Sequence, residues 1–486
     1  MSSADQKLAA KVSSTLGAGD RRGFKRAVIE LMKSKSSLTS GWKSLSERLY
    51  EFGEIDLACK AITLYAHAVN TPGAQIERAL MYAQCARPGD ALAMLEVVEK
   101  IVPDIASHAY LRGTIALNLG LQETAKAALI VANRERPSSG QIYQTLSMLG
   151  SLRNQPDIVE IIIGAKPRMA TASNIDRAAY LYALGKTYDD LGETDRAFAA
   201  FSEGALLVSQ IRRYDPIADA VQSQAAISGW TASRIEAVGR GIKLSTNRPI
   251  IVAGLPRSGS TLAEHILTSH SAVTGGGELG RFVQVADEVG GVDFSAFDLW
   301  ERSHPASEAS RTYLYLITQR FGNNGRVVDK TLAASRYLGL LAAVMPEAPI
   351  VWMCRNPLDT AWSCFSTWFS NGLPWSWSQE AIAQHFALED RLLGYWETVL
   401  GKRLKVVRYE DLVNDKHRVI PEILEHSGLS VEQAVFSPEA NQRLVATASV
   451  SQVRNPINNH AVGRAQRYAA HLQPFIDRYQ ALFQST

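Results

Sequence analysis

A glycine-bordered loop holds the first residues whose types and spacing could do chemistry. It reads Gly254-Leu-Pro-Arg-Ser-Gly-Ser-Thr261 and follows the apolar run Pro249-Ile-Ile-Val-Ala253. An apolar stretch with helical character, Leu262 to Thr268, comes next. A loop between a strand and a helix points backbone N–H groups at an anion held at the helix N-terminus. The motif therefore predicts an anion-binding turn, and a plain tight turn is the alternative.

One position separates this loop from loops that bind nucleoside triphosphates. In the pattern G-x-x-x-x-G-K-[ST], the lysine reaches the β- and γ-phosphates and the next hydroxyl holds Mg²⁺. Ser260 occupies the lysine position here, and Arg257 lies inside the loop. ATP or GTP hydrolysis is therefore disfavoured. A single phosphosulfate bound without a metal suits the loop, with the predicted ligands Arg257, Ser258, Gly259, Ser260 and Thr261.

A second phosphate site is predicted after the apolar run Pro349-Ile-Val-Trp-Met353. Arg355 follows this run, and Ser363 comes eight residues later, on a helix expected to start near Pro357. An arginine and a hydroxyl on one strand–loop–helix turn can both donate to the same phosphate. Arg355 alone would indicate little, because surface arginines are common. Its combination with Ser363 and a buried strand favours phosphate binding.

A carboxylate and a lysine complete the set that could do chemistry. Glu278 stands in Thr274-Gly-Gly-Gly-Glu-Leu-Gly-Arg281, where three glycines let the backbone approach a ligand closely. A carboxylate within reach of a hydroxyl can take its proton. Lys330 follows the short run Arg326-Val-Val328 and, with Arg257, could stabilise negative charge on a departing phosphate. The alternatives are a solvated loop glutamate and a lysine that faces water.

These motifs together resemble sulfotransferases that use 3′-phosphoadenosine 5′-phosphosulfate (PAPS). The segment from Arg248 to Tyr468 is similar to that family, especially to protein-tyrosine sulfotransferases and to bacterial sulfotransferases with tetratricopeptide repeats. The resemblance implies that Arg355 and Ser363 bind the 3′-phosphate. It also implies that Glu278, 21 positions beyond Arg257, is the catalytic base, and that Arg257 and Lys330 stabilise the leaving phosphate.

The resemblance extends to four further residues. Arg281 resembles an arginine on the acceptor side, and Tyr409, in Val406-Val-Arg-Tyr-Glu-Asp-Leu412, resembles a tyrosine that touches the nucleotide. Ser449 and Arg464, fifteen apart, resemble a phosphate-contacting serine and a basic residue in the segment that closes over the nucleotide. The chain departs from the family there, because it has Ala461 and Ala465 where many relatives have a serine and an aromatic residue.

The elements that must position these residues change in character near Asn247. Beyond it, short apolar runs alternate with helical stretches, as in an α/β doubly wound, P-loop-like domain with a parallel sheet. The sulfotransferase fold is therefore expected over residues 247–486. Its predicted strands are Pro249 to Ala253, Arg326 to Val328, Pro349 to Met353 and Leu404 to Val407.

The first half carries an internal repeat. Mostly small residues five apart recur at Gly53/Ala58, Ala86/Ala91, Gly120/Ala125, Asn154/Val159 and Gly192/Ala197, so the second member returns after 33, 34, 34 and 38 residues. Tetratricopeptide repeats have a period of about 34 residues, and a small residue in each helix would let a helix pair pack closely. We expect an all-α repeat solenoid over 41–212, a cap or degenerate repeat over 1–40 and a helical connector over 213–246. A plain helical bundle is the alternative.

Composition narrows the function classes further. A chain of 486 residues with 51 basic and 48 acidic residues needs more than one core and shows no bias toward nucleic acid or acidic membranes. We expect no signal peptide, no membrane span and no metal site. We expect a cytoplasmic location. The four cysteines are predicted to be buried thiols. The aromatic residues between Trp362 and Trp377 are read either as core or as a wall at the acceptor mouth.

The leading interpretation is a sulfotransferase that moves a sulfuryl group from PAPS to an acceptor hydroxyl, protein tyrosine being one option. The repeats would bind the acceptor or a partner protein. A peptide, a glycan, a lipid and a small molecule all stay open as acceptors. The alternative is a repeat-based scaffold with an inactive or nucleotide-sensing domain, and a P-loop kinase or NTPase is a third reading.

Overall fold

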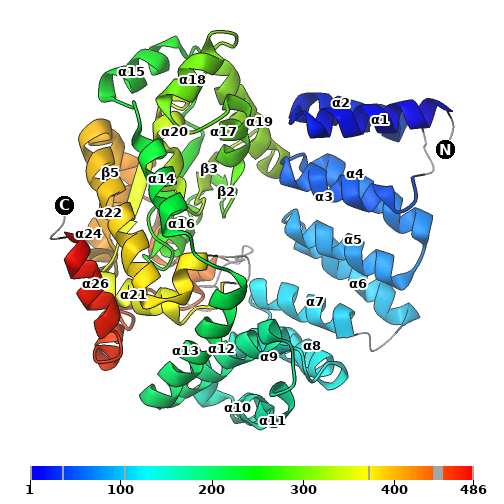
Figure 1. Ribbon diagram of the computed structural model, residues 1–486, viewed down its shortest axis with the longest axis vertical. Helices are drawn as coiled ribbons and strands as arrows, with labels where there is room; N and C mark the ends of the chain where they lie inside the picture. The colour runs from blue at the N-terminus through cyan, green and yellow to red at the C-terminus, as the bar shows by residue number, and fades with distance from the viewer. Residues whose placement is uncertain (1–2, 35–37, 103–105, 370–372, 442–452, 484–486) are drawn as a thin grey trace.

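The computed structural model describes residues 3–34, 38–102, 106–369, 373–441 and 453–483. An array of helices in the first half curves alongside an α/β region in the second half (Figure 1). The fold class predicted from the sequence is confirmed: a repeat array precedes a domain with a parallel sheet.

The array is a stack of antiparallel helix pairs, as expected for tetratricopeptide repeats. Two helices, α14 and α15, connect it to the sheet. The elements of the array and connector are α1 Ser3–Gly17, α2 Arg21–Lys33, α3 Gly41–Glu51, α4 Ile55–Val69, α5 Pro72–Gln84, α6 Pro88–Ile101, α7 Ala106–Asn118, α8 Gln122–Glu135, α9 Gly140–Ser147, η1 Leu152–Asn154, α10 Pro156–Gly164, α11 Lys166–Met169, α12 Asn174–Leu191, α13 Thr194–Ile211, α14 Pro216–Ile227 and α15 Ala232–Gly241.

The recurring small residues have different roles from those expected. Both members of each pair of residues five apart were predicted to lie in helices. The first members Gly53 and Gly192 instead lie in turns, with φ of 78° and 86°. Glycine adopts this left-handed conformation without a steric penalty. The second member, such as Ala197, is buried where the helices of a pair meet. Close packing inside a helix comes from Gly185, because a Cβ there would lie 2.8 Å from the Phe201 ring.

The sheet has five parallel strands in the order β2-β3-β1-β4-β5. β1 is buried along its whole length, as expected for a central strand covered on both faces. The four predicted strands are present, whereas the short edge strand β2 was not predicted. The strands are β1 Pro249–Ala253, β2 Val273–Gly275, β3 Arg326–Asp329, β4 Ile350–Cys354 and β5 Leu404–Arg408.

Helices and short 3₁₀ segments surround this sheet. They are α16 Ser260–Leu267, α17 Arg281–Val289, α18 Phe294–Glu301, α19 Ser307–Phe321, η2 Ala334–Tyr337, α20 Leu338–Val344, α21 Pro357–Phe365, η3 Pro374–Trp377, α22 Gln379–Leu400, η4 Gly401–Arg403, α23 Tyr409–Asn414, α24 Lys416–His426, η5 Gln433–Phe436, η6 Pro438–Ala440, η7 Arg464–Tyr468 and α26 Gln473–Phe483.

The last repeat shares a hydrophobic core with the α/β domain. Tyr182 on α12 has its ring centroid 5.4 Å from that of Trp368 and 5.5 Å from that of Trp377. Phe201 on α13 meets Trp362 edge to face at 5.6 Å. The aromatic cluster after β4 is therefore largely core, as one of the two readings held, and it joins the array to the domain. Aromatic pairs of this geometry add to the energy of apolar burial.

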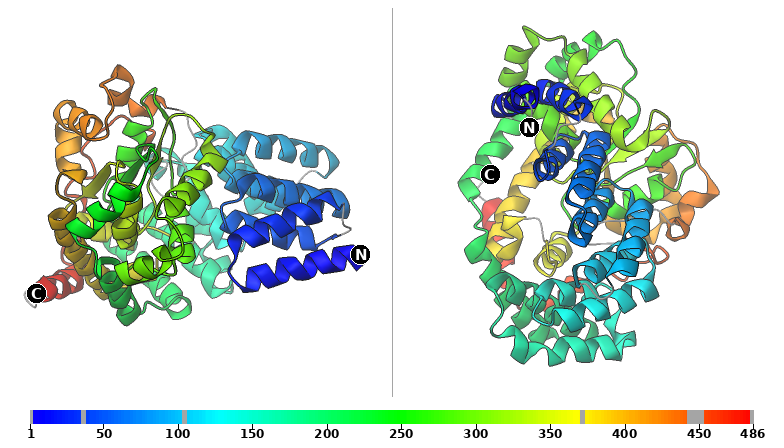
Figure 2. Two further views of the ribbon diagram at one scale, coloured as in Figure 1. Left: turned by 90° about the horizontal axis from the view of Figure 1, so that it is seen from above. Right: turned by 90° about the vertical axis from the view of Figure 1, so that its right-hand side faces the viewer.

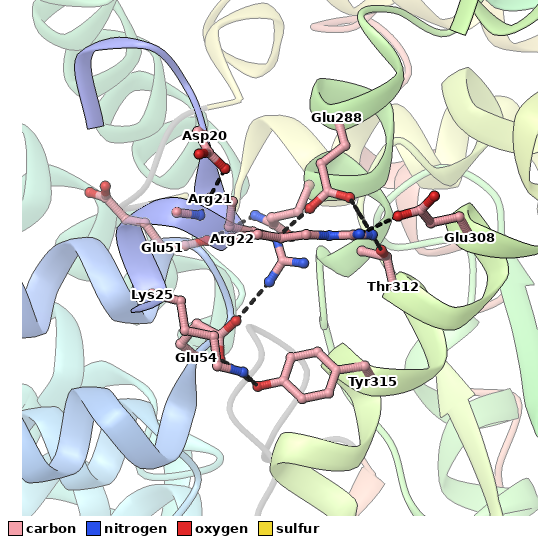
Figure 3. A network of polar contacts seen from close by, with 12 residues as sticks. Asp20, Arg21, Arg22, Lys25, Glu51, Glu54, Glu288, Glu308, Thr312 and Tyr315 are labelled. Atoms are coloured by element: carbon pink, nitrogen blue, oxygen red, sulfur yellow. Dashed lines mark hydrogen bonds and ion pairs between the residues drawn. The ribbon is translucent and has the colours of Figure 1, made fainter. Parts of the chain in front are cut away.

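The other end of the array also docks on the α/β domain. Figure 3 shows polar side chains of α2 and the α3–α4 turn meeting α17 and α19. Arg21 donates to Glu54 at 2.7 Å and to Glu288 at 2.5 Å. Glu54 also accepts from Tyr315 at 2.5 Å and lies 3.1 Å from Lys25 Nζ. The array thus touches the domain at both ends, and Figure 2 shows its middle repeats arching between them.

Candidate active site between the sheet and the repeats

The carboxyl ends of four neighbouring strands position the predicted site. β1 ends at the glycine-bordered loop, β3 at Lys330, β4 at Arg355 and β5 at Tyr409. Because parallel strands end at one edge of the sheet, side chains distant in sequence meet there, which is where ligands bind in open α/β sheets. This explains why Arg257, Lys330, Arg355 and Tyr409 each follow an apolar run in the sequence.

The loop after β1 has an unusual backbone. Gly254 and Gly259 have φ of 121° and 99°, and Arg257 has φ of 68° without being a glycine. A Cβ at Gly254 would lie 2.3 Å from the Met353 carbonyl oxygen, so the loop packs tightly against β4. Non-glycine residues in this conformation cluster at functional sites, where the surrounding structure maintains the strain.

Arg257 and Ser363 lie side by side. Arg257 Nε donates to Ser363 Oγ at 2.8 Å, which links the loop to α21. The loss of solvent around this guanidinium lowers the pKa of Arg257 to about 10. The side chain therefore keeps its positive charge at neutral pH, as an anion-binding role requires.

Arg355 connects the loop to the C-terminal segment. Its guanidinium donates to the Arg257 carbonyl at 3.2 Å and to the Ala461 carbonyl. It lies 3.8 Å from Asp359 and packs over the Tyr409 ring at 4.8 Å. Burial raises the pKa of Tyr409. Three of the residues predicted to hold the donor thus gather around one turn.

The predicted base and the predicted lysine form an ion pair. Lys330 Nζ lies 2.8 Å from Glu278 Oε1 and 4.0 Å from Glu264 Oε2. Lys330 is buried, whereas the Glu278 side chain is 37% exposed and can reach a ligand. Glu264, on α16, was not predicted from the sequence. Its only signal was a carboxylate on an apolar helix just after the loop.

Two cavities meet at the loop. We name the larger the central chamber: it has a volume of about 520 Å³, and Glu278 and Lys330 line it together with repeat residues of α7, α9 and α12. We name the other the side cavity: it has a volume of about 420 Å³ and is lined by Tyr409 and by residues 453–461. Both cavities share the residues Lys186, Arg257, Ser260, Thr261, Arg355, Ala461 and Arg464.

Two predicted residues line neither cavity, and a third falls outside the described residues. Arg281 was expected on the acceptor side, but it lies at the start of α17 and points to the first repeat, with its guanidinium 6.0 Å from the Tyr50 ring. Ser258 is buried and lines neither cavity, so only its backbone is placed to act in the loop. Ser449 lies outside the described residues.

The last repeat holds the C-terminal segment through one carboxylate. Asp189, buried on α12, accepts from Tyr468 at 2.6 Å and from Arg464 and Arg467. Arg464, predicted from the sequence to contact the donor, is therefore fixed by the repeat array. Asp189 was not predicted either, because nothing in the repeat pattern shows that α12 and the C-terminal segment, about 275 positions apart, are in contact.

We expect Asp189→Ala to lower the free energy of unfolding by about 1–3 kcal/mol, because it leaves the buried Tyr468 hydroxyl and two arginines without their acceptor. Urea unfolding and hydrogen exchange over residues 464–468 would measure this. Asp195→Ala is the matched control, since that carboxylate is 92% exposed and should change stability by less than about 0.5 kcal/mol. Equal effects in the two variants would contradict the role given to Asp189.

Comparison with known proteins shows which family the C-terminal half is similar to. Residues 249–433 match the sequence model of the sulfotransferase family. Residues 249–433, which include the loop, Glu278 and Lys330, are thus similar to the sulfotransferase family, whose general chemistry is the transfer of a sulfuryl group.

Two curated relatives are similar over part of the chain. An uncharacterized protein of Aquifex aeolicus is 28% identical over 63% of this chain and 42% of its own length. The nodulation protein NoeE of Sinorhizobium fredii is 27% identical over 38% of this chain and 51% of its own length. The matched part of this chain thus spans about half the length of these relatives.

Two solved structures are similar to part of the chain. The sulfotransferase domain of the curacin biosynthetic pathway is 16% identical with a TM-score of 0.30, over 46% of this chain and 96% of its own. The type IV pilus biogenesis factor PilW is 14% identical with a TM-score of 0.31, over 42% of this chain and 93% of its own.

No helix among the described residues combines the length and the apolar character needed to cross a bilayer. Nor do the described residues contain a cluster of three or more His, Cys, Asp or Glu side chains that could hold a metal ion. Of the four cysteines, Cys59, Cys85 and Cys364 are buried thiols, as predicted, and Cys354 is half-buried.

Proposed function

We propose that the chain transfers a sulfuryl group from PAPS to a hydroxyl of an acceptor, with Glu278 as the base. The observation that carries this proposal is the position of the Glu278–Lys330 pair, which lines the central chamber beside the loop that the chamber shares with the side cavity. A donor held in the side cavity would present its phosphosulfate at that loop. An acceptor would enter from the chamber.

In this proposal the acceptor oxygen attacks sulfur in line with the bond to the 5′-phosphate. A new S–O bond forms, the old S–O bond breaks, and 3′-phosphoadenosine 5′-phosphate (PAP) leaves with the electron pair. The acceptor proton passes to the Glu278 carboxylate. Arg257 and Lys330 stabilise the charge that builds on the leaving phosphate, which is electrostatic catalysis by groups already in place.

The donor would be held by the residues that gather around the loop. The backbone amides at the start of α16, with Ser260 and Thr261, face the side cavity and suit the phosphosulfate. Arg355 suits the 3′-phosphate, Tyr409 the nucleotide, and Arg464 the rim that both cavities share. We further propose that residues 247–486 form the catalytic domain, and that the repeats over 41–212 bind the acceptor.

We expect Arg355→Ala to weaken PAP binding about 10- to 100-fold, since hydrogen bonds to a charged phosphate contribute more than neutral ones. Isothermal titration calorimetry with PAP would measure this. Arg408→Ala is the matched control, because Arg408 is exposed at the end of β5 and lines neither cavity. If Arg355→Ala left the affinity intact and instead abolished turnover, its assigned role would be wrong.

The direct test of the proposed function is an assay with the whole chain and PAPS that carries radiolabelled sulfur. Peptides, phenols, glycans and lipids would serve as acceptors. Transfer of label to a hydroxyl, lost in Glu278→Ala, is the expected result. Absence of transfer to every acceptor class, together with undetectable affinity for PAP, would contradict the proposal and favour a scaffold role for the repeats.

A further inference from the structure

The repeat wall of the central chamber faces the Glu278–Lys330 pair. This wall comes from α7, α9 and α12, which lie in the middle and last repeats. A cavity of about 520 Å³ lies within the range of sites that hold small ligands or short segments of a larger one. The lining side chains of α7 and α9 that carry hydrogen-bonding groups are Tyr110, Thr114, Asn118, Gln141, Gln144, Thr145 and Ser147.

The repeat wall offers no free charge among its described residues. Its charged side chains are Lys186 and Asp189. Lys186 pairs with Asp190, and Asp189 is occupied by two arginines and Tyr468. An acidic segment entering the chamber would therefore meet no unpaired cation on the repeat side. Complementary charge is what proteins use to select charged partners, so this wall favours a neutral acceptor.

The amide side chains of this wall are available to a ligand. Asn118, Gln141 and Gln144 are half-buried, and within the described part of the chain their side-chain amides make no hydrogen bond to protein atoms. Each amide offers two donors and an acceptor. An acceptor that fits this wall must therefore offer several hydrogen-bonding groups at short spacing.

Two aromatic donors lie deeper in the same chamber. Tyr182 is 2% exposed and Trp368 is 7% exposed, and both line the cavity. Neither the Tyr182 hydroxyl nor Trp368 Nε1 has a hydrogen-bond partner among the described residues. Buried donors without partners cost stability, so each such group needs an explanation. The two polar atoms have almost no accessible surface of their own, so these residues give the chamber an aromatic, apolar floor.

We propose that the central chamber binds a neutral carbohydrate chain as the sulfuryl acceptor, an inference that rests on the proposed function. A sugar unit carries several hydroxyls around an apolar ring face. The hydroxyls match the free amides, and the ring face matches the aromatic floor of Tyr182 and Trp368. A simple phenol has one hydroxyl, which the reaction consumes, so the amides would stay unpaired. A tyrosyl peptide is the competing acceptor that the experiment separates.

The experiment uses the whole chain, PAPS with radiolabelled sulfur and three neutral trisaccharides: maltotriose, cellotriose and tri-N-acetylchitotriose. A neutral tyrosyl peptide and 4-nitrophenol are assayed beside them. We expect label on at least one trisaccharide, with kcat/KM above that of the peptide and the phenol. Labelling of the peptide or the phenol without any trisaccharide would overturn the carbohydrate proposal while leaving sulfuryl transfer intact. If the wild-type chain did not bind PAP at all, the proposed function itself would be overturned.

A substitution in the repeat wall tests whether the acceptor binds in the central chamber. We expect Gln144→Ala to raise the KM for the labelled trisaccharide about 3- to 10-fold, with kcat and PAP affinity unchanged, because one hydrogen bond to the acceptor is lost. Gln222→Ala is the control and should leave KM unchanged, because Gln222 is an exposed glutamine on α14 that does not line the chamber. An unchanged KM in Gln144→Ala would count against acceptor binding at this wall.

Discussion

Replacing Glu278 with glutamine is expected to lower kcat about 10²- to 10⁴-fold while PAP affinity stays close to that of the wild type. The amide has the shape of the carboxylate but cannot take the acceptor proton, and general-base catalysis contributes about this factor. Lys330 keeps Glu264 at 4.0 Å, so the cation that faces the leaving phosphate stays in place. Steady-state transfer of labelled sulfur at saturating substrates would measure kcat, and calorimetry would measure PAP affinity.

The matched control is Glu236→Gln on α15. This carboxylate is 70% exposed and pairs only loosely with Arg240, at 3.5 Å. Its removal should leave both kcat and PAP affinity unchanged. If Glu278→Gln kept more than a tenth of the wild-type kcat, proton removal by Glu278 would not be the source of catalysis. If it instead lost PAP affinity, Glu278 would belong to the donor site.

The second large effect is expected where the N-terminal end of the array contacts the α/β domain. There, Glu54→Ala should lower the free energy of unfolding by about 3–5 kcal/mol. The Glu54 side chain is 1% exposed and holds Arg21, Lys25 and Tyr315 together. Breaking a buried pair by removing one partner leaves the other charge buried without compensation, which is strongly destabilising. Urea unfolding, together with hydrogen exchange resolved over α2 and α4, would measure the loss.

A neighbouring surface pair gives the control for that prediction. Glu51 pairs with Arg48 at 2.6 Å, but both side chains are 55% exposed. Such pairs contribute about 0–1 kcal/mol, so Glu51→Ala should be nearly neutral. A loss below about 1 kcal/mol in Glu54→Ala, or similar losses in the two variants, would mean that this contact does not fasten the array to the domain.

Part of the candidate site could be predicted because four of its residues come directly after predicted strands of the parallel sheet. An apolar run marks the strand, and the polar residue just after it marks the edge where ligands bind. This rule alone places Arg257, Lys330, Arg355 and Tyr409 near one another. It also explains why the strand boundaries deviate little, with β4 shifted by one residue from Pro349–Met353 to Ile350–Cys354.

The parts that escaped prediction depend on contacts between the two halves of the chain. Asp189 gains its meaning only when α12 packs beside η7, and Arg281 turns toward Tyr50 because the first repeat covers α17. Nothing in the local pattern of either residue encodes such a contact.

The strand β2 is three residues long at the edge of the sheet, so it carries too little apolar sequence to be recognised.

The docking of both ends of the array has a functional consequence in our account. The middle repeats stand opposite the loop because α2 is fixed to α17 and α19 at one end and α12 is fixed to η7 at the other. The repeats are then a wall of the active site as well as a surface for binding. Gln144, Tyr182 and Asp189 are the residues through which this wall would act.

The central claim is that the turn from Gly254 to Thr261 holds a sulfated nucleotide and not a triphosphate. Calorimetry of the wild-type chain with PAP in the presence of EDTA tests it most directly, with Mg²⁺-ATP as the competing ligand in a second titration without EDTA. We predict that PAP binds without a metal and that Mg²⁺-ATP does not displace it. Binding of Mg²⁺-ATP in preference to PAP, or no binding of PAP at all, would contradict the account.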